Sequence, residues 1–167
     1  MNKKLQFDFL VDKEKNTLTV KREFAAEPEL VWDAYTKSEL LDQWFAPKPW
    51  KTKTKTMDFR EGGFWLYAMC GPEGEEHWAR LDYLKIQPKV NYTALDGFCD
   101  AEGNLSDQLP QANWSVTFEP MAENTLVETV VTYQSLNDLE TIIQMGMKEG
   151  LTMAMEGLDE LLEGLKK

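Results

Sequence analysis

Hydrophobic and polar positions alternate with two different periods along this chain, and the change of period separates predicted strands from predicted helices. Runs with strand-like alternation occupy residues 5–11, 17–25, 51–56, 64–70, 77–86, 90–95, 113–119 and 125–134. Helical spacing appears in 28–36, in a second short segment that ends at Trp44, and in the last part of the chain. Short polar segments separate most of the strands, which favours hairpins and an antiparallel sheet.

The last segment is predicted to form one long amphipathic helix from Asn137 to Leu165, with Asn137 as its N-cap and Glu140 completing a capping box. Gly146 and Gly150 lie in or beside the apolar stripe of this helix, although a glycine inside a helix costs about 1 kcal/mol relative to alanine. Two glycines one turn apart indicate a need for close approach or for empty space. Neighbouring residues of the stripe are Ile143, Met147 and Leu151.

Two short helices are predicted after the first pair of strands. Pro28 occupies the first position of one helix, where its missing N–H is not needed, and Glu29 follows in the first turn. Ser38 is predicted to cap the second helix. Pro47 and Pro49 then end helical structure.

This order of elements predicts an α+β fold. A helix with a single apolar stripe has to pack against one face of the antiparallel sheet, and a sheet that curves around such a helix can enclose a cavity. A chain of 167 residues is long enough for one domain with a substantial core. We therefore expect a single domain over residues 1–167, in which 1–16 form an N-terminal strand and turn extension.

The charge of the chain excludes some classes of partner. Asp and Glu outnumber Lys and Arg by 29 to 18, which gives a net charge of −11 and a pI near 4.6. Nucleic-acid binding is not expected, because it requires a basic face. Membrane insertion is not expected either, since no apolar run approaches the roughly 20 residues that span a bilayer. Residues 1–20 lack the apolar core of a signal peptide, and the prediction is a cytoplasmic protein.

Few residues are arranged for catalysis or metal binding. His77 is the single histidine, and it follows two glutamates after a turn, which favours an exposed position. Cys70 and Cys99 are far apart and show no ligand spacing. We therefore expect no metal site and no cofactor, and the catalytic residues, if there are any, stay unassigned.

Three ordered segments resemble one protein family. They are Glu-Pro-Glu-Leu-Val-Trp-Asp-Ala at 27–34, Leu-Asp-Gln-Trp-Phe-Ala-Pro at 41–47 and Asp-Phe-Arg-Glu-Gly-Gly at 58–63. Together they resemble the activator of heat-shock-protein-90 ATPase-like family, which belongs to the START-related, birch-pollen-allergen-like (SRPBCC) superfamily. The resemblance implies a helix-grip fold, in which a curved antiparallel β-sheet is wrapped around a long C-terminal α-helix. It also implies a hydrophobic cavity between the two.

Strand alternation assigns residues to that cavity. The larger side chains of 64–70 and the apolar set of 113–119 are predicted to face inward. In 77–86, Arg80 and Asp82 share a face with Ile86, so an inward Ile86 would bring both charges into the cavity as an anchor for the polar end of a ligand. The alternative is an ion pair at the cavity mouth or on a solvated face. The residues predicted to bind a ligand are Trp65, Tyr67, Met69, Trp78, Arg80, Asp82, Trp114, Val116, Phe118, Ile143, Gly146, Met147, Gly150 and Leu151.

Three functions are compatible with these patterns. The first is binding of a small hydrophobic molecule in a cavity between the curved sheet and the C-terminal helix. The second is an enzyme of the cyclase or hydrolase type that uses polar groups in the cavity, with Tyr67 beside the charged pair as candidates. The third is an interaction module with a chaperone partner, for which Phe45, Pro47 and Trp50 are the candidate exposed apolar residues.

Overall fold

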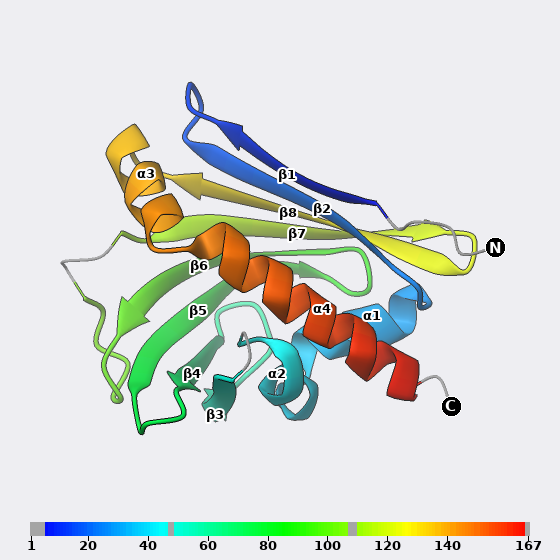
Figure 1. Cartoon of the computed structure of the whole chain (residues 1–167), viewed down its shortest axis with the longest axis horizontal. Helices are drawn as coiled ribbons and strands as arrows, with labels where there is room; N and C mark the ends of the chain where they lie inside the picture. The colour runs from blue at the N-terminus through cyan, green and yellow to red at the C-terminus, as the bar shows by residue number, and fades with distance from the viewer. Residues whose placement is uncertain (1–5, 47–48, 107–109, 166–167) are drawn as a thin grey trace.

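The computed structural model of the protein describes residues 6–46, 49–106 and 110–165. Within these residues, eight antiparallel strands form one sheet in the order β1-β2-β8-β7-β6-β5-β4-β3 (Figure 1). The strands are β1 (Phe7–Asp12), β2 (Thr17–Phe24), β3 (Lys51–Met57), β4 (Phe64–Cys70), β5 (Glu76–Gln87), β6 (Asn91–Cys99), β7 (Ala112–Met121) and β8 (Asn124–Tyr133). The helices are α1 (Pro28–Thr36), α2 (Ser38–Trp44), α3 (Leu136–Gln144) and α4 (Met147–Leu165).

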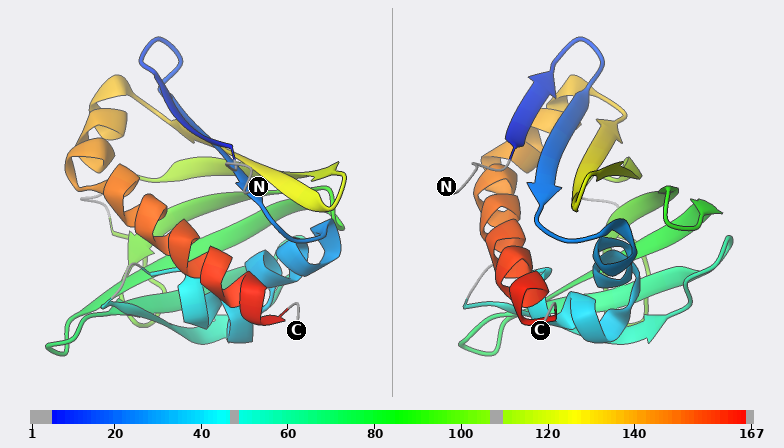
Figure 2. Two further views of the ribbon diagram at one scale, coloured as in Figure 1. Left: turned by 45° about the vertical axis from the view of Figure 1, so that its right-hand side comes forward. Right: turned by 90° about the vertical axis from the view of Figure 1, so that its right-hand side faces the viewer.

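The sheet curves around α4, and the other helices lie at the two ends of the concave face (Figures 1 and 2). Helices α1 and α2 follow β2 and precede β3 in the chain, and both pack against α4 near its C-terminal end. Helix α3 packs on β8 at the opposite end. The predicted α+β class and helix-grip architecture are confirmed, because the sheet grips a C-terminal helix on one face.

The prediction of one unbroken helix over 137–165 is wrong. Helix α3 ends at Gln144 and α4 begins at Met147, so the chain turns at Met145 and Gly146. Gly146 has a φ of +92°, in the left-handed region where a side chain is strained, and its N–H donates to the Ile143 carbonyl at 3.0 Å. Glycine therefore ends a helix here, whereas its spacing had suggested a glycine inside one.

Two predicted helix caps are also corrected. The N-cap of α3 is Ser135, whose Oγ accepts a hydrogen bond of 3.1 Å from the Asp138 N–H. Asn137 instead lies inside the first turn. Ser38 is the first residue of α2, and the N-cap is Lys37, which makes no side-chain cap bond. Pro28 begins α1 as predicted.

The turn before β4 shows why its sequence carries two adjacent glycines. Arg60 donates from Nε to Asp58 Oδ2 at 2.7 Å, which forms an exposed ion pair at the corner. Gly62 has a φ of +86°, and a Cβ at Gly63 would lie 2.1 Å from the Asp58 carbonyl oxygen. Only residues without a side chain fit this corner, so the segment that resembles the family is structural.

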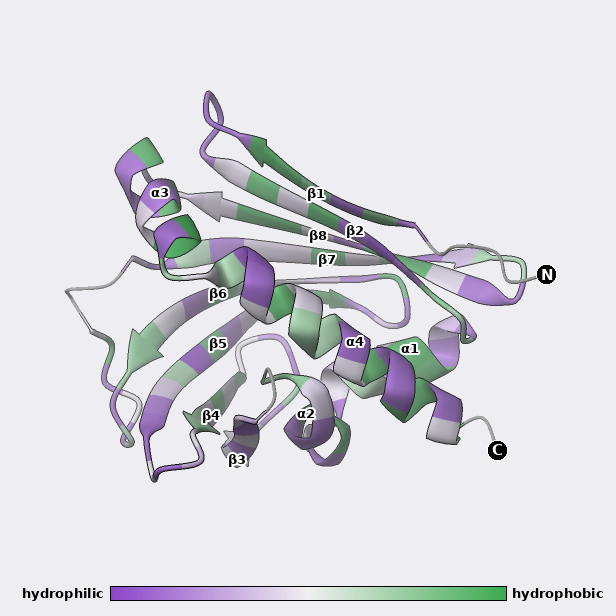
Figure 3. Cartoon of the chain, viewed as in Figure 1, coloured by the Kyte–Doolittle hydropathy of each residue, from purple (hydrophilic) through white to green (hydrophobic). Residues whose placement is uncertain are grey.

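Aromatic side chains fill one end of the concave face. Trp32 from α1 makes edge-to-face contacts with Phe59, Tyr92 and Phe118 at centroid distances of 5.7, 6.2 and 5.0 Å. Leu158 and Leu162 of α4 are fully buried in the same cluster. Hydrophobic residues recur along α4 as green bands in Figure 3, and the buried residues of this helix are Ala154, Met155, Leu158 and Leu162. Aromatic rings fill most of this half of the concave face, which leaves more open space toward α3.

Candidate functional site

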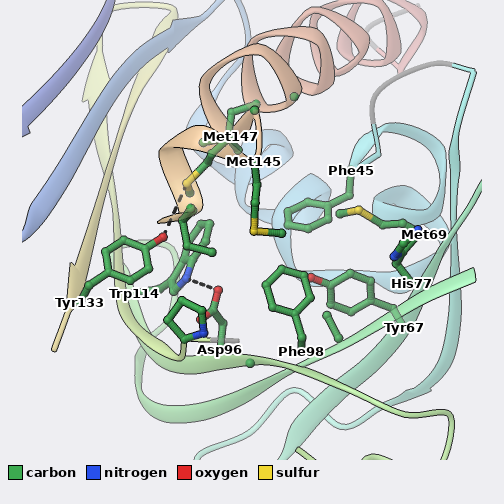
Figure 4. A pocket seen from close by; sticks show the side chains of 17 residues that line it. Phe45, Tyr67, Met69, His77, Asp96, Phe98, Trp114, Tyr133, Met145 and Met147 are labelled. Atoms are coloured by element: carbon green, nitrogen blue, oxygen red, sulfur yellow. Dashed lines mark hydrogen bonds between the residues drawn. The ribbon is translucent and has the colours of Figure 1, made fainter. Parts of the chain in front are cut away.

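A pocket of about 320 Å³ lies between the inner face of the sheet and the turn that joins α3 to α4 (Figure 4). In Figure 4, Met145 enters the space from the helical side, while Phe98 and Asp96 face it from the sheet. The described residues that line it are Phe45, Tyr67, Met69, His77, Ala79, Asp96, Gly97, Phe98, Pro110, Trp114, Tyr133, Ile142, Met145, Gly146, Met147, Gly150 and Leu151. Most of this lining is apolar, as in the binding sites of small organic molecules.

The break between the helices helps to keep this space open. Gly146 ends α3 and Gly150 lies one turn later, so two positions on the helical wall carry no side chain. Met145 and Met147, on either side of Gly146, supply flexible side chains that can adapt to different shapes. The predicted link between the two glycines and empty space therefore agrees with the position of the pocket.

A smaller internal space of about 40 Å³ lies deeper, between the pocket and the aromatic core. Tyr67, Asp96 and Trp114 line both spaces. Trp65 borders only the inner space, and its ring stacks on Tyr67 at a centroid distance of 3.9 Å. The stacked pair forms a rigid wall at the deep end of the pocket.

Asp96 is the acidic residue of the pocket wall. It lies on β6, where alternation with Tyr92 and Ala94 turns it toward the concave face. Its Oδ1 accepts from the Ala112 N–H at 3.0 Å, and its Oδ2 accepts from Trp114 Nε1 at 2.6 Å. Burial raises the pKa of Asp96 to about 6, although both hydrogen bonds favour the ionised form. At neutral pH the pocket therefore contains a carboxylate that is costly to keep charged.

Two tyrosines place hydroxyl groups near this carboxylate. Tyr133 of β8 donates to Met147 Sδ at 3.6 Å, which ties the last strand to the start of α4 (Figure 4). Tyr67 of β4 lines the pocket with no hydrogen bond to its hydroxyl among the described residues. Burial, and next the Asp96 charge, raises the pKa of both tyrosines, so both remain protonated donors near neutral pH.

The predicted face of β5 is wrong for three residues. The pairing of β5 with β6 shifts by one residue between Tyr83 and Lys85. Ile86 does pack against the core, but the bulge reverses the faces of the residues before it, so Trp78, Arg80 and Asp82 lie on the outer face. His77 and Ala79 line the pocket in their place.

The charged pair is therefore an ion pair of the outer surface. Arg80 donates from Nη2 to Asp82 Oδ1 at 2.6 Å and from Nη1 to the Gly103 carbonyl at 2.9 Å. Its guanidinium lies 4.6 Å from the centre of the Phe64 ring. These contacts hold the loop after β6 against the sheet, and they place the pair away from any ligand in the pocket.

The structure brings together half of the residues predicted to bind a ligand. The pocket wall contains Tyr67, Met69, Trp114, Gly146, Met147, Gly150 and Leu151. Trp65 and Val116 line only the inner space. Phe118 is buried in the aromatic core. Ile143 of α3 is only partly buried, while its neighbour Ile142 lines the pocket.

Sequence reasoning missed several lining residues, of which Asp96 matters most. It falls just after the strand predicted for 90–95, which in the structure continues to Cys99. The alternation that buries Tyr92 and Ala94 could have identified it. Met145 was missed because an unbroken helix gives it no special position. Phe45 was expected at the surface, but its ring packs edge-to-face on Trp65 and Tyr67 at 5.0 and 5.7 Å and lines the pocket.

The pocket can accept a hydrogen bond or a positive charge from a bound molecule through the Asp96 carboxylate.

Within residues 6–46, 49–106 and 110–165, no three His, Cys, Asp or Glu side chains are close enough together to hold a metal ion. Pro47, one of the residues considered for a partner surface, lies outside the described part of the chain.

A family model described as "Activator of Hsp90 ATPase homolog 1-like protein" matches residues 25–163. The chain belongs to this family. The match extends over all three segments that carried the resemblance, and the helix-grip fold agrees with the SRPBCC superfamily in which the family is placed. Family membership leaves the ligand or partner of this chain open.

Solved structures of bacterial relatives share the fold over nearly the whole chain. Protein Ms6760 from Mycobacterium smegmatis is 30% identical and matches with a TM-score of 0.87, covering 95% of this chain and 97% of that one. A protein from Arthrobacter aurescens is 27% identical, with a TM-score of 0.89 and coverage of 94% and 91%. A third, from Staphylococcus epidermidis, is 27% identical, with a TM-score of 0.81 and coverage of 92% and 93%.

The comparison with curated proteins gave no match. Among the helices that the structure describes, none combines the length and the apolar character that a membrane crossing requires.

Proposed function

We propose that this protein binds a small hydrophobic molecule in the pocket between the curved sheet and the α3–α4 turn. The observation that carries the proposal is the pocket itself, with a volume of about 320 Å³ and a mainly apolar wall. Known ligand pockets have volumes of roughly 300–1,000 Å³ and similar linings. Since the opposite half of the concave face is filled by aromatic rings, the space is local to one end of the fold.

The family name raises a second candidate, a chaperone-associated interaction module. Its support in this chain is weaker. Such a module would need an exposed apolar patch, whereas Phe45, one of the three candidate residues for it, packs on Trp65 and lines the pocket. Trp50 is only partly exposed and lies beside His77, with ring centroids 5.3 Å apart. The pocket therefore carries the main proposal.

NMR titration of the isotope-labelled protein tests the binding function. The probe is butylbenzene, a neutral apolar molecule without a head group. We expect saturable shifts of the Trp114 indole N–H and of the Gly146 and Gly150 amides, while the Trp78 indole on the outer face stays unchanged. Absence of saturable shifts at all three pocket reporters would overturn the proposal.

A pair of variants on β5 provides the matched control. Ala79→Phe adds a ring at the pocket wall and is expected to weaken binding at least about tenfold, because it occupies the space that a ligand needs. Leu84→Phe adds a similar ring to the same strand at a side chain that is 47% exposed and outside the pocket, and affinity should stay the same. Equal affinities of the two variants would place the binding elsewhere.

A further inference from the structure

We propose that the ligand of this pocket is an apolar molecule with a basic amino group, and that the ammonium is held by the Asp96 carboxylate. This inference rests on the proposed binding function and adds the chemical class of the ligand. It follows from the position of the acid, from its remaining capacity to accept hydrogen bonds, and from the charges around it.

The first step is the capacity of Asp96 to accept another donor. A carboxylate has about four lone-pair positions, and the Ala112 N–H and the Trp114 indole use one position on each oxygen. Asp96 also lines the pocket, so part of its carboxylate faces the space that a ligand would fill. The two protein donors hold the side chain in place and leave room for a third donor.

The second step is the charge of the surroundings. Among the described residues of the pocket wall there is no lysine or arginine. Arg80, the cation that the sequence pattern suggested for the cavity, lies on the outer face and donates to Asp82 and the Gly103 carbonyl. An apolar acid would therefore place its carboxylate beside Asp96 with no counter-ion from these residues, and like charges in a poorly solvated site repel strongly.

The third step concerns the approach to the pocket. The Glu149 carboxylate is close to Gly146 on the helical wall, with its Oε2 3.8 Å from the position of a Cβ at that glycine. The chain as a whole carries a net charge of −11. The net charge favours the approach of cations over anions to the protein as a whole, and the exposed Glu149 carboxylate adds to this near Gly146.

The fourth step uses the energetic state of the acid. Burial raises the pKa of Asp96 to about 6, which means that its surroundings disfavour the ionised form. An ammonium bound beside it would compensate the buried charge and lower that pKa. A ligand carboxylate bound at the same place would raise the pKa of Asp96 further, because a second negative charge favours the protonated form of Asp96.

A series of four probes with the same apolar body tests the proposal on the wild-type protein. The probes are 4-phenylbutylamine, 4-phenylbutanol, 4-phenylbutyric acid and butylbenzene, titrated at about pH 7.5 with the pocket reporters described above. We expect the amine to bind at least about tenfold more tightly than each of the other three, since a charge-assisted hydrogen bond is stronger than a neutral one. Binding of the alcohol, the acid or the hydrocarbon as tightly as the amine would overturn the inference.

The same series separates this inference from the binding function. If butylbenzene gives saturable pocket shifts but the amine shows no advantage, the pocket binds apolar molecules and the assigned ligand class is wrong. If none of the four probes binds, the proposed function and the inference fail together.

Lowering the pH provides a test that needs no mutation. The titratable groups that line the pocket with Asp96 are Tyr67 from β4, His77 from β5 and Tyr133 from β8. Tyr35 from α1 and Tyr92 from β6 line the inner space that Asp96 also borders, and the exposed Glu149 of α4 lies near Gly146. At about pH 5 Asp96 is mostly protonated, so the advantage of the amine over butylbenzene should fall severalfold. An advantage that stays constant between these two pH values would contradict the role of Asp96.

Two variants assign the pH effect to the correct residue. Asp96→Asn keeps the shape of the side chain and should remove the advantage of the amine at about pH 7.5, while butylbenzene still binds. His77→Gln removes the imidazole that also lines the pocket from its exposed position, and the fall in the advantage of the amine at low pH should persist in this variant if Asp96 causes it. If Asp96→Asn does not fold, the pH series on wild type and on His77→Gln decides the question.

Discussion

Asp96 makes the stability of the folded protein depend on pH in an unusual direction. Its pKa rises from 3.8 to about 6 because burial disfavours the charge. The folded state therefore holds the Asp96 proton more tightly than the unfolded state does. The stability associated with this proton is fully present below about pH 4 and is lost as the pH rises through about 6.

The size of this effect follows from the two pKa values. A tenfold difference in proton affinity between folded and unfolded states is worth about 1.4 kcal/mol. For values of 3.8 and about 6, the wild-type protein should lose about 2 kcal/mol of this contribution between about pH 4 and about pH 7.5. Other carboxyl groups also titrate over this range, so the effect has to be isolated by comparison with a variant.

Asp96→Asn is the variant that isolates it. Asparagine cannot ionise, but it can accept from only one of the two donors, Trp114 Nε1 or the Ala112 N–H, so the variant carries a cost of about 1–3 kcal/mol that does not depend on pH. We expect the free energy of unfolding of wild type minus that of the variant to decrease by about 2 kcal/mol from about pH 4 to about pH 7.5. Urea unfolding followed by tryptophan fluorescence measures this difference at each pH.

The refuting result is a difference that is constant or increases with pH. It would mean that the hydrogen bonds, rather than burial, dominate the environment of Asp96. Asp100→Asn is a matched control on the same segment, because hydrogen bonds from the backbone and then the side chain of Asn104 lower the pKa of this exposed carboxyl. For Asp100 the sign is opposite and the effect lies below about pH 4, so the difference between wild type and variant should stay nearly constant from about pH 7.5 to about pH 4 and decrease at lower pH.

Two further predictions concern the helices that form the pocket wall. Ser135→Ala should destabilise the protein by about 1 kcal/mol in urea unfolding, because the Asp138 N–H loses the oxygen that caps the helix. Ser135→Asp should retain the stability, because its carboxylate can accept the same hydrogen bond. Equal losses of stability in the two variants would show that the cap contributes nothing. Asp159→Ala should cost about 2–3 kcal/mol, since it leaves the buried Arg22 guanidinium without its partner on α4, although Asp159 is itself 36% exposed. Asp33→Ala breaks the surface pair with Lys37 and should cost less than about 0.5 kcal/mol, and a similar cost for both variants would contradict the reasoning.

Much of the architecture could be predicted because it depends on local patterns. The hairpin of β1 and β2, the proline at the start of α1 and the strand over 64–70 are each determined by neighbouring residues, and the structure has them where they were expected. Antiparallel pairing also follows from short turns between strands. The motif at 58–63 needs its glycines for a corner that the backbone makes by itself.

The site was less predictable because one local irregularity changes many assignments. A single bulge between Tyr83 and Lys85 reverses a face of β5, and it moves Arg80 and Asp82 from the expected cavity to the outer surface. Strand periodicity carries no signal for such a bulge, since it arises from the twist and pairing of neighbouring strands. In the same way, helical periodicity continues across Gly146, although the chain turns there.

The sequence by itself therefore determined the order and type of the elements, the family and the general position of a cavity beneath the C-terminal segment. Only the tertiary structure decided which groups enter that cavity. Asp96 meets Trp114 across a strand pair, and Arg22 meets Asp159 from 137 residues away. The physical reason is that periodicity acts over a few residues, whereas burial, hydrogen bonding and charge in the pocket depend on segments that come together only when the sheet closes around the helix.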